Sequence, residues 1–382
     1  MTQEDRLNVD SAVRNRYSEA AQAQVPALCC PVEYNQEYLK VIPQEVIERD
    51  YGCGDPSAFV KKGETVLDLG SGTGKICFIA SQVVGSEGRV IGIDMNDDML
   101  EIAKNAATLV GERIGYENVE FRKGKIQDLK LDRDRVDTYL RENPIQSEAD
   151  LRKFEELSQN LMSESPLVAD NSVDVVVSNC VLNLVENSQK ELLFQEIFRV
   201  LKRGGRAVIS DIVSDEPIPE HMQNDAELWS GCISGAYQEA EFLRAFERAG
   251  FYGISLAKRD ETPWQTVEGI EFRSVTVIAY KGKEGECWDH KEALVYKGPF
   301  QSVRDDDGHE FVRGERVAVC RKTFEIFSKE PYQEHFYLVK PLQAVAAEDA
   351  TEFPCTSKTL MRDPKETKGQ DYKATIGQGS CC

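Results

Sequence analysis

The stretch Thr65-Val66-Leu67-Asp68-Leu69-Gly70-Ser71-Gly72-Thr73-Gly74 constrains the fold of this chain more than any other part of the sequence. Its first five residues have the character of a buried parallel strand. Three alternating glycines follow directly, and residues 75–80 then begin a predicted helix. A strand that turns into a helix over G-x-G-x-G leaves bare backbone against which a ligand can lie. We therefore expect a ligand-binding α/β domain built around this turn.

The same strand-and-helix alternation continues along the chain. Helical stretches with apolar residues on one face separate the further strands that we predict, which are 89–93, 119–121, 173–178 and 206–210. Such an alternation predicts a doubly wound parallel sheet with right-handed crossovers.

Three stretches of the chain do not follow this pattern, namely an insertion, a β-rich part and a polar tail. A charge-rich stretch at about 130–168 interrupts the alternation and indicates a helical surface insertion. Long surface insertions are tolerated because the entropy of loop closure grows slowly with length. We expect four parts in the chain. Residues 1–215 form the ligand-binding domain, and 216–285 complete its sheet. Residues 286–345 form a small β-rich domain, and 346–382 form a flexible tail ending in Cys381-Cys382.

Charge and composition exclude several classes of function. The net charge of −20 argues against binding a nucleic-acid backbone or an anionic membrane surface. The N-terminus is polar and acidic, and no apolar run approaches the length of a membrane span. We expect a cytoplasmic monomer in which the eleven cysteines are mostly reduced thiols.

The ends of three predicted strands indicate which ligand is bound. The glycine spacing is G-x-G-x-G and not the dinucleotide spacing G-x-G-x-x-G. Asp68 can hold an ammonium group, Asp94 can accept the ribose hydroxyls, and Ile126 lies where adenine would pack. These three parts match S-adenosylmethionine, so we predict a Rossmann-like class I methyltransferase sheet. The alternatives are a nicotinamide enzyme and a nucleotide-binding module.

Three cysteines from separate loops suggest the acceptor of the methyl group. Cys180 lies two residues past a predicted strand end, where the reactive methyl group would be. Cys53 and Cys232 lie in glycine-containing loops that we expect to expose the sulfur and to let the backbone approach closely. Three such thiols suggest a site for a soft ion. Zinc is disfavoured because Cys-x-x-Cys spacing is absent and the four histidines show no ligand spacing.

These residues carry a resemblance to the arsenite S-adenosylmethionine methyltransferases. It extends from about Tyr17 into the β-rich C-terminal part. Two departures are Gly231, where members of the family often have glutamate, and the length of the insertion. The strings that carry the resemblance are Tyr51-Gly52-Cys53-Gly54, Asp68-Leu69-Gly70-Ser71-Gly72-Thr73-Gly74, Gly92-Ile93-Asp94-Met95, Ser178-Asn179-Cys180-Val181-Leu182-Asn183-Leu184 and the pair Trp229 and Cys232.

The resemblance implies a substrate, a cofactor site and a reaction. Cys53, Cys180 and Cys232 would hold trivalent arsenic, with 216–285 as an arsenite-binding region. Arsenite and then methylarsenite would be methylated by in-line transfer from S-adenosylmethionine, in arsenic detoxification. The residues that we expect at the cofactor are Tyr17, Tyr51, Asp68, Gly70, Ser71, Gly72, Asp94, Met95, Ile126 and Asn179.

The resemblance also implies a thiol relay, because methylation formally oxidises arsenic. Cys30 is the upstream relay cysteine that we choose, with Cys29 as its rival. A Cys30–Cys53 disulfide would return the electrons, and thioredoxin or glutathione would then reduce it.

Several assignments stay open on the sequence alone. A methyltransferase for a small organic acceptor and a thiol-based sink for soft metals are the competing functions. Cys77 is expected in the core, and Cys287, Cys320 and Cys355 show no pattern and are expected to be structural. Cys381-Cys382 is either a mobile pair that captures arsenite or a dispensable tail.

Overall fold

The computed structural model divides the chain into two compact units, Met1–Lys281 and Gly282–Cys382. It describes all residues except 1–7, 23–24, 26–31, 356–357 and 369–382. Among the described residues, none of the helices is both long and apolar enough to cross a membrane.

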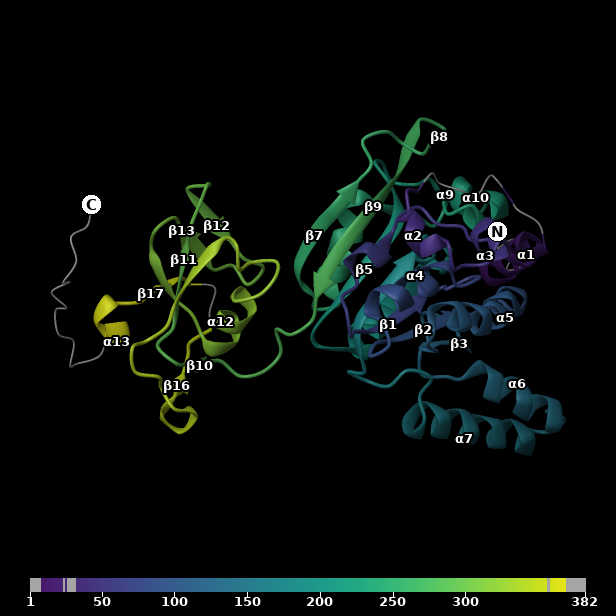
Figure 1. Cartoon of the computed structure of the whole chain (residues 1–382), viewed down its shortest axis with the longest axis horizontal. Helices are drawn as coiled ribbons and strands as arrows, with labels where there is room; N and C mark the ends of the chain where they lie inside the picture. The colour runs from purple at the N-terminus through teal and green to yellow at the C-terminus, as the bar shows by residue number, and fades with distance from the viewer. Residues whose placement is uncertain (1–7, 23–24, 26–31, 356–357, 369–382) are drawn as a thin grey trace. The chain divides into compact units, whose positions relative to one another are not determined.

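A mixed sheet forms the centre of the first unit, and its strand order is β3-β2-β1-β4-β5-β9-β7 (Figure 1). The first five of these strands are parallel, as the sequence predicts. They are β1 Thr65–Leu69, β2 Arg89–Asp94, β3 Val119–Lys123, β4 Val173–Asn179 and β5 Leu201–Ser214. The predicted class I methyltransferase fold is therefore confirmed.

The last two strands of the sheet, β7 Tyr252–Arg259 and β9 Ile270–Tyr280, are antiparallel to their neighbours. The sequence predicted that 216–285 completes the sheet, but it did not predict β7 or the direction of β9. A parallel pair needs a crossover of a dozen or more residues. The link between β7 and β9 is shorter and holds β8 Gln265–Val267, which pairs back on β9. Another short strand, β6 Tyr237–Gln238, pairs with the end of β5.

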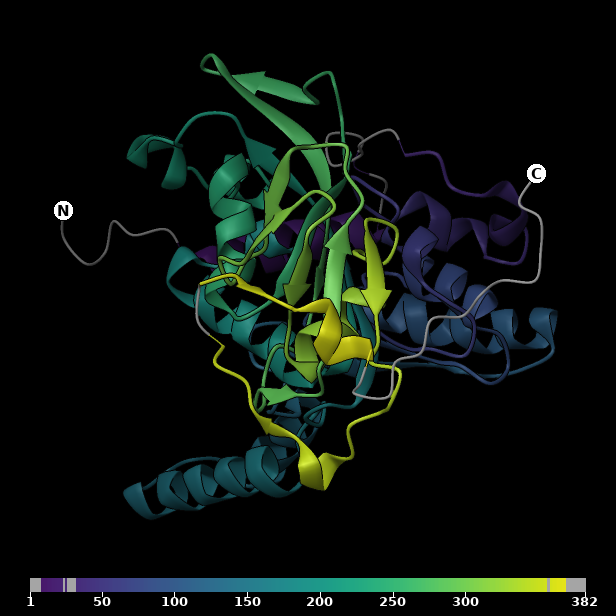
Figure 2. The ribbon, with the colours of Figure 1, turned by 90° about the vertical axis from the view of Figure 1, so that its left-hand side faces the viewer.

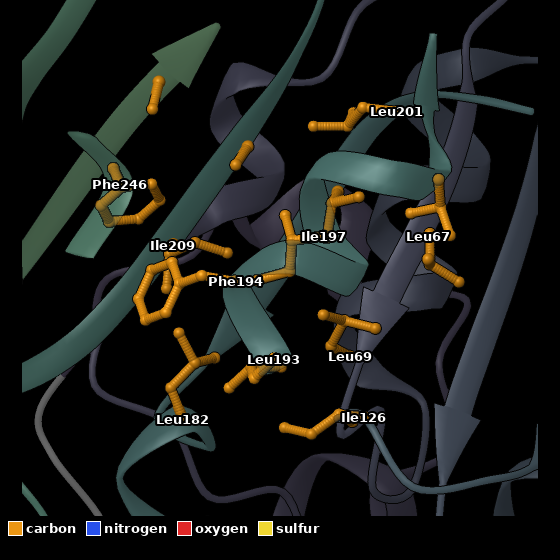
Figure 3. Packing of buried hydrophobic residues seen from close by; sticks show 14 of the residues in the cluster. Leu67, Leu69, Ile126, Leu182, Leu193, Phe194, Ile197, Leu201, Ile209 and Phe246 are labelled. Atoms are coloured by element: carbon orange, nitrogen blue, oxygen red, sulfur yellow. The ribbon is translucent and has the colours of Figure 1, made fainter. Parts of the chain in front are cut away.

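Helices cover both faces of the sheet, so its central strands are buried on both sides. One apolar cluster contains Val66 and Phe78 and the other contains Leu67 and Phe194. The covering helices are α4 Lys75–Val84 and α5 Asp97–Ile114 on one face, and α8 Lys190–Val200 and α11 Glu239–Arg248 on the other. In Figure 3, Phe194 and Ile197 of α8 lie among side chains of β1 and β5.

Further helices and 3-10 turns complete the first unit. They are α1 Val9–Gln22, α2 Gln36–Leu39, α3 Gln44–Glu48, α9 Glu220–Gln223 and α10 Ala226–Ser230, with the 3-10 turns η3 Pro56–Phe59, η4 Leu182–Leu184 and η5 Asn187–Gln189.

The predicted insertion consists of two helices, α6 Arg133–Glu142 and α7 Glu148–Glu164. Their apolar faces share a small cluster that includes Val136 and Leu161. In both views α7 extends away from the sheet of its unit (Figure 1, Figure 2). This cluster is separate from the sheet core, which explains why the insertion leaves the alternation around it intact.

The second unit is β-rich, as predicted, and centres on the four-stranded sheet β15-β11-β14-β17. Its core is largely aromatic and includes Phe311, Phe327 and Phe336. Its elements are β10 Trp288–Asp289, β11 Ala293–Tyr296, β12 Ser302–Arg304, β13 Glu310–Val312, β14 Arg316–Ala318, α12 Arg321–Phe327, β15 Phe336–Val339, η6 Ala347–Asp349, β16 Thr351–Glu352, β17 Leu360–Met361 and α13 Pro364–Lys368.

The prediction of a flexible tail from residue 346 differs from the structure, which has folded elements as far as Lys368. Arg362 is buried and its Nη2 lies 2.7 Å from Oδ1 of Asp289, which is also buried. Buried charges persist in a fold when they are paired. The polar composition of this segment therefore did not indicate disorder, because some of its charged side chains form ion pairs inside the fold. Cys381 and Cys382 lie outside the described residues.

Replacing Phe194 by alanine should destabilise the first unit strongly. Phe194 is fully buried and makes an edge contact with Phe246 at a ring-centroid distance of 4.9 Å. We expect Phe194→Ala to lower the free energy of unfolding by about 3–5 kcal/mol. Leu192→Ala on the same helix is the control, because Leu192 is 48% exposed, and it should cost no more than about 0.5 kcal/mol. Equal losses in chemical denaturation would contradict the assigned core.

Candidate active site

The glycine turn after β1 has the backbone conformation that its sequence predicts. Gly70, Gly72 and Gly74 have φ angles of 70°, 52° and 93°, a left-handed region that favours glycine. A Cβ atom on Gly70 would also lie 2.4 Å from Val181. The amides of Gly70 and Ser71 both donate to the carbonyl of Ile93. The turn is thereby bound to the end of β2.

A pocket lies beyond the carboxyl ends of β1 to β4, as expected for an open α/β sheet. Six of the ten residues predicted at the cofactor line it: Tyr17, Gly70, Gly72, Asp94, Met95 and Ile126. The other lining residues are Asp10, Val13, Arg14, Asn96, Met99, Gln127, Val181, Leu184 and Val185. Tyr51, Asp68, Ser71 and Asn179 are not among the lining residues, so their contacts with a cofactor stay predictions.

Three acidic or polar groups lie beside the turn, of which Asp68 and Ser71 are buried and Asp94 is half-buried. Asp94 accepts hydrogen bonds from the amides of Gly72 and Asn96, each at 2.8 Å, and burial raises the pKa of its carboxyl. Burial raises the pKa of Asp68 to about 7, against the opposing effect of the hydrogen bond that Cys77 donates. The hydroxyl of Ser71 has no hydrogen-bond partner among the described residues. A ligand with a cationic group and hydroxyl groups would pair with both carboxylates and with the Ser71 hydroxyl.

Helix α1 covers the pocket and is held from two directions. Arg16 Nη1 donates to the Glu227 carbonyl at 2.8 Å and to Ser230 Oγ at 3.0 Å, which joins α1 to α10. On the other side, Asn96 Nδ2 donates to Ser18 Oγ at 3.1 Å. The side chain of Tyr17 therefore has a fixed position between the pocket and the loop that carries Cys232.

Tyr17 and Tyr51 have different positions, although both were predicted at the cofactor. The Tyr17 hydroxyl lies 4.0 Å from the sulfur of Cys232. Burial and the neighbouring Cys232 raise the pKa of that hydroxyl. Tyr51 donates to the Ala20 carbonyl at 3.1 Å and accepts from the Val25 amide at 3.0 Å. Tyr51 thus holds the end of α1, whereas Tyr17 connects the pocket with the cysteine region.

Asn179, the last residue of β4, holds the Cys53 loop against the sheet. Its Oδ1 accepts hydrogen bonds from the amides of Cys53 and Gly54 at 2.9 and 3.0 Å, and its Nδ2 donates to the Gly54 carbonyl at 2.8 Å. A Cβ atom on Gly52 would lie 2.1 Å from Nδ2, so glycine is required for this approach. The prediction that this loop approaches closely is confirmed.

The prediction that the glycine-containing loops expose their sulfurs is wrong. Cys53, Cys180 and Cys232 are all buried, and they share an apolar cluster with Ile212 and Phe272. The small glycines let the loops pack down on the sheet, so the side chains between them are covered.

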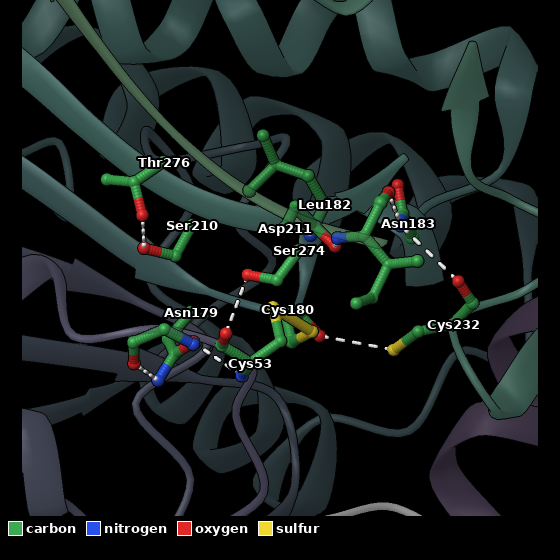
Figure 4. The surroundings of a disulfide bond; sticks show 12 residues. Cys53, Asn179, Cys180, Leu182, Asn183, Ser210, Asp211, Cys232, Ser274 and Thr276 are labelled. Atoms are coloured by element: carbon green, nitrogen blue, oxygen red, sulfur yellow. Dashed lines mark hydrogen bonds between the residues drawn. A yellow bond between two sulfur atoms is a disulfide. The ribbon is translucent and has the colours of Figure 1, made fainter. Parts of the chain in front are cut away.

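Cys53 and Cys180 form a disulfide in the structure, with their Cα atoms 5.8 Å apart (Figure 4). This pair departs from the expectation of mostly reduced thiols, whereas Cys30, the predicted relay partner of Cys53, lies outside the described residues. The sulfur of Cys232 donates to the Cys180 carbonyl at 3.3 Å. Chain segments far apart in sequence therefore bring the three predicted cysteines into one buried region.

Cys180 and Cys232 also share an unusual backbone conformation. Their φ angles are 63° and 64°, in the left-handed region that costs a non-glycine residue on the order of 1–2 kcal/mol. Strain of this kind persists where the surrounding structure enforces it, and it is concentrated at functional sites.

Two buried charged residues near the cysteines were not predicted. A carboxylate oxygen of Asp211 and the sulfurs of Cys53 and Cys180 lie within 4.8 Å of one another. Burial raises the pKa of Asp211 to about 7, and Lys190 opposes this shift. Burial lowers the pKa of Lys190 to about 8, and Asp211 and Cys232 oppose that shift. The position of Asp211 directly after the predicted strand 206–210 was the available signal for it, whereas Lys190 lies in an ordinary amphipathic helix.

Comparison with known proteins shows which protein families this chain resembles. A family model described as a methyltransferase domain matches residues 60–169 and 146–250, and a domain of unknown function matches 283–372. The arsenite methyltransferase of Mus musculus is 30% identical over 366 residues, covering 91% of this chain and 87% of the mouse protein. That of Aquipseudomonas alcaligenes is 29% identical, covering 86% and 90%.

A solved structure and a more distant relative extend the comparison. The crystal structure of an arsenic(III) S-adenosylmethionine methyltransferase from Chlamydomonas reinhardtii has a TM-score of 0.55 and 26% identity, covering 82% of this chain and 98% of that chain. A ubiquinone/menaquinone biosynthesis C-methyltransferase of Klebsiella pneumoniae is 28% identical over 171 residues, which is 45% of this chain and 51% of that protein. The arsenite methyltransferase similarity therefore spans much more of the chain.

Ionisation of Asp68 should lower the stability of the protein without cofactor as the pH rises. Because the pKa of Asp68 is about 7 in the folded state against an ordinary 3.8, the folded state binds the proton more tightly. The melting temperature should therefore fall between about pH 4 and pH 7.

Asp68→Asn tests this dependence, because it removes the titrating group. The fall in melting temperature should become smaller, although Asp211 contributes in the same pH window. Asp98→Asn, which replaces an exposed carboxyl, is the matched control and should keep the full fall. A larger fall in Asp68→Asn than in the wild type would contradict the assignment.

Proposed function

The chain belongs to the arsenite methyltransferase family, and we propose that it methylates trivalent arsenic held by Cys53, Cys180 and Cys232. As a member of this S-adenosylmethionine-dependent family, it takes arsenite as substrate and S-adenosylmethionine as methyl donor. The observation that carries the residue assignment is the position of Tyr17, which lines the cofactor pocket and contacts Cys232. The cysteine region and the pocket are therefore adjacent.

The residues beside the glycine turn fit S-adenosylmethionine. Asp94 would accept the ribose hydroxyls, and Asp68 would hold the ammonium group, whose charge compensates a carboxylate that burial otherwise disfavours. Ile126 and Gln127 would contact the adenine. When bound, S-adenosylmethionine supplies an electrophilic methyl group. Helix α1 covers this pocket, so the chain restricts access of water to it.

The three cysteines would bind arsenite by exchanging its three hydroxyl groups for sulfur. The Cys53–Cys180 disulfide first takes up two electrons and two protons from a thiol reductant. Three thiols and arsenite then give three arsenic–sulfur bonds and three water molecules, with no change of oxidation state. Arsenic with three sulfur ligands is pyramidal, so its lone pair remains free as the nucleophile for in-line methyl transfer. The Asp211 carboxylate lies within 4.8 Å of the Cys53 and Cys180 sulfurs, and it would accept thiol protons during the exchange through a bridging water molecule.

The disulfide also supports a proposal for the return of electrons. Methylation raises the formal oxidation state of arsenic by two, and two cysteine thiols that become a disulfide supply two electrons. Cys53 and Cys180 can form that bond, since the structure joins them. Thioredoxin or glutathione would then reduce the disulfide, in a cycle that serves arsenic detoxification.

Serine variants of the cysteines test the proposed ligand set. Cys53→Ser, Cys180→Ser and Cys232→Ser should each lower arsenite methylation by at least about 100-fold, because one lost ligand leaves arsenic misplaced. Isothermal titration should show that each variant still binds S-adenosylmethionine. Asp94→Asn is the complementary control, and it should weaken cofactor binding while arsenite binding remains. Full arsenite methylation by any of the three serine variants would contradict the proposed ligand set.

The predicted Cys30–Cys53 disulfide would form if the Cys30 thiolate attacked Cys53 in the Cys53–Cys180 disulfide and released the Cys180 thiolate, and this relay needs a separate test. Cys30→Ser should slow repeated turnover with thioredoxin or glutathione, while the first turnover of the reduced enzyme proceeds normally. Cys29→Ser is the matched control, since it removes the adjacent thiol, and it should behave as the wild type. If Cys30→Ser keeps full multiple turnover, Cys30 is not part of the relay. If Cys29→Ser alone is slow, the role belongs to Cys29.

A further inference from the structure

Three cysteines of the second unit converge although they are far apart in sequence. The sulfur atoms of Cys287, Cys320 and Cys355 all lie within 4.8 Å of one another. Cys287 precedes β10, Cys320 precedes α12, and Cys355 follows β16. The sequence showed no pattern among them because the spacing matches no ligand motif. None of the three belongs to the unit that contains the cofactor pocket.

The backbone around these cysteines holds them together independently of any sulfur bond. Strands β10 and β16 pair antiparallel, with Trp288 opposite Glu352. The Phe353 amide donates to the Cys287 carbonyl at 2.8 Å, and the Cys355 amide donates to the Phe353 carbonyl at 2.8 Å. Cys320 is 1% exposed and packs in a cluster with Phe353. The convergence should therefore persist when the sulfurs are reduced.

The number of ligands at this cluster selects the kind of ion that it can hold. Among the described residues, the group of ligand atoms within this distance contains three cysteines and no histidine or carboxylate. Structural zinc sites almost always have four protein ligands, whereas trivalent arsenic is saturated by three sulfurs. Cys355 is exposed and Cys287 half-buried, so the cluster is open to solvent on one side. The hydroxyl of Thr323 lies 3.3 Å from the Cys320 sulfur and can donate to it.

We propose that Cys287, Cys320 and Cys355 form a second binding site for trivalent arsenic, separate from the catalytic one. In the structure Cys287 and Cys355 are joined by a disulfide, and Cys320 is a free thiol. A thiol or phosphine reductant adds two electrons and two protons and opens that bond. Arsenite then exchanges three hydroxyls for three thiols and releases three water molecules. The choice of arsenic rests on the proposed function, whereas the convergence of the sulfurs does not.

The test uses the full chain with Cys53→Ser, Cys180→Ser and Cys232→Ser, which removes the catalytic ligands. After reduction with a phosphine, addition of arsenite and desalting, elemental mass spectrometry measures the arsenic that each chain retains. We expect one arsenic atom per chain and X-ray absorption typical of three sulfur ligands. Adding Cys355→Ser should abolish retention, and it is a mild change because Cys355 is exposed. Adding Cys381→Ser and Cys382→Ser instead is the matched control and should leave retention unchanged.

Other results of these experiments would each contradict one part of the proposal. Retention that survives Cys355→Ser, or that disappears with the tail variants, would overturn the assignment to this cluster. Tightly bound zinc that arsenite does not displace would overturn the choice of ion. Fluorescence of Trp288, next to Cys287 and 42% exposed, gives a second readout in which arsenite should change the emission unless Cys355 is replaced. If the wild type fails to methylate arsenite but the background variant retains arsenic, the proposed function fails and this site stands.

Discussion

The site depends on the hydrogen bonds by which the Asn179 side chain holds the Cys53 loop at the end of β4. Asn179 accepts from two amides of that loop and donates to one of its carbonyls. Leaving a buried backbone group of this kind unpaired costs about 1–3 kcal/mol, so the loop has little freedom to leave. The next residue is Cys180, whose left-handed backbone turns the chain sharply after the strand. One amide side chain therefore places two cysteines within bonding distance.

The parallel sheet and helix α1 connect this cysteine region with the cofactor pocket. The carboxyl ends of β1, β2 and β4 meet at one edge, so the glycine turn, Asp94 and Cys180 are collected there by topology alone. Cys232 comes from a different part of the chain, after α10, and Tyr17 of α1 contacts it. Since Arg16 binds α10 through Glu227 and Ser230, the position of Cys232 and the cover of the pocket are coupled.

The sequence predicted what local pattern and strand topology determine. Strand β1 and the glycine turn follow from one short stretch, and six of the residues predicted at the cofactor line the pocket. The pairing of Cys53 with Cys180 could not be predicted, because the connectivity of cysteines is not encoded in their spacing. Asp211 and the cluster around Cys320 depend on contacts between distant segments. The folded part of the tail was missed because Arg362 counts as polar in composition yet is buried by its pairing with Asp289.

The most direct test of the three-cysteine site is anomalous diffraction at the arsenic absorption edge from crystals of the reduced protein soaked in arsenite. We expect an arsenic peak bonded to the sulfurs of Cys53, Cys180 and Cys232, beside the Tyr17 hydroxyl and facing the pocket. A peak bonded to Cys53 and Cys180 without Cys232, or no peak in this region while the three sulfurs are reduced, would contradict it.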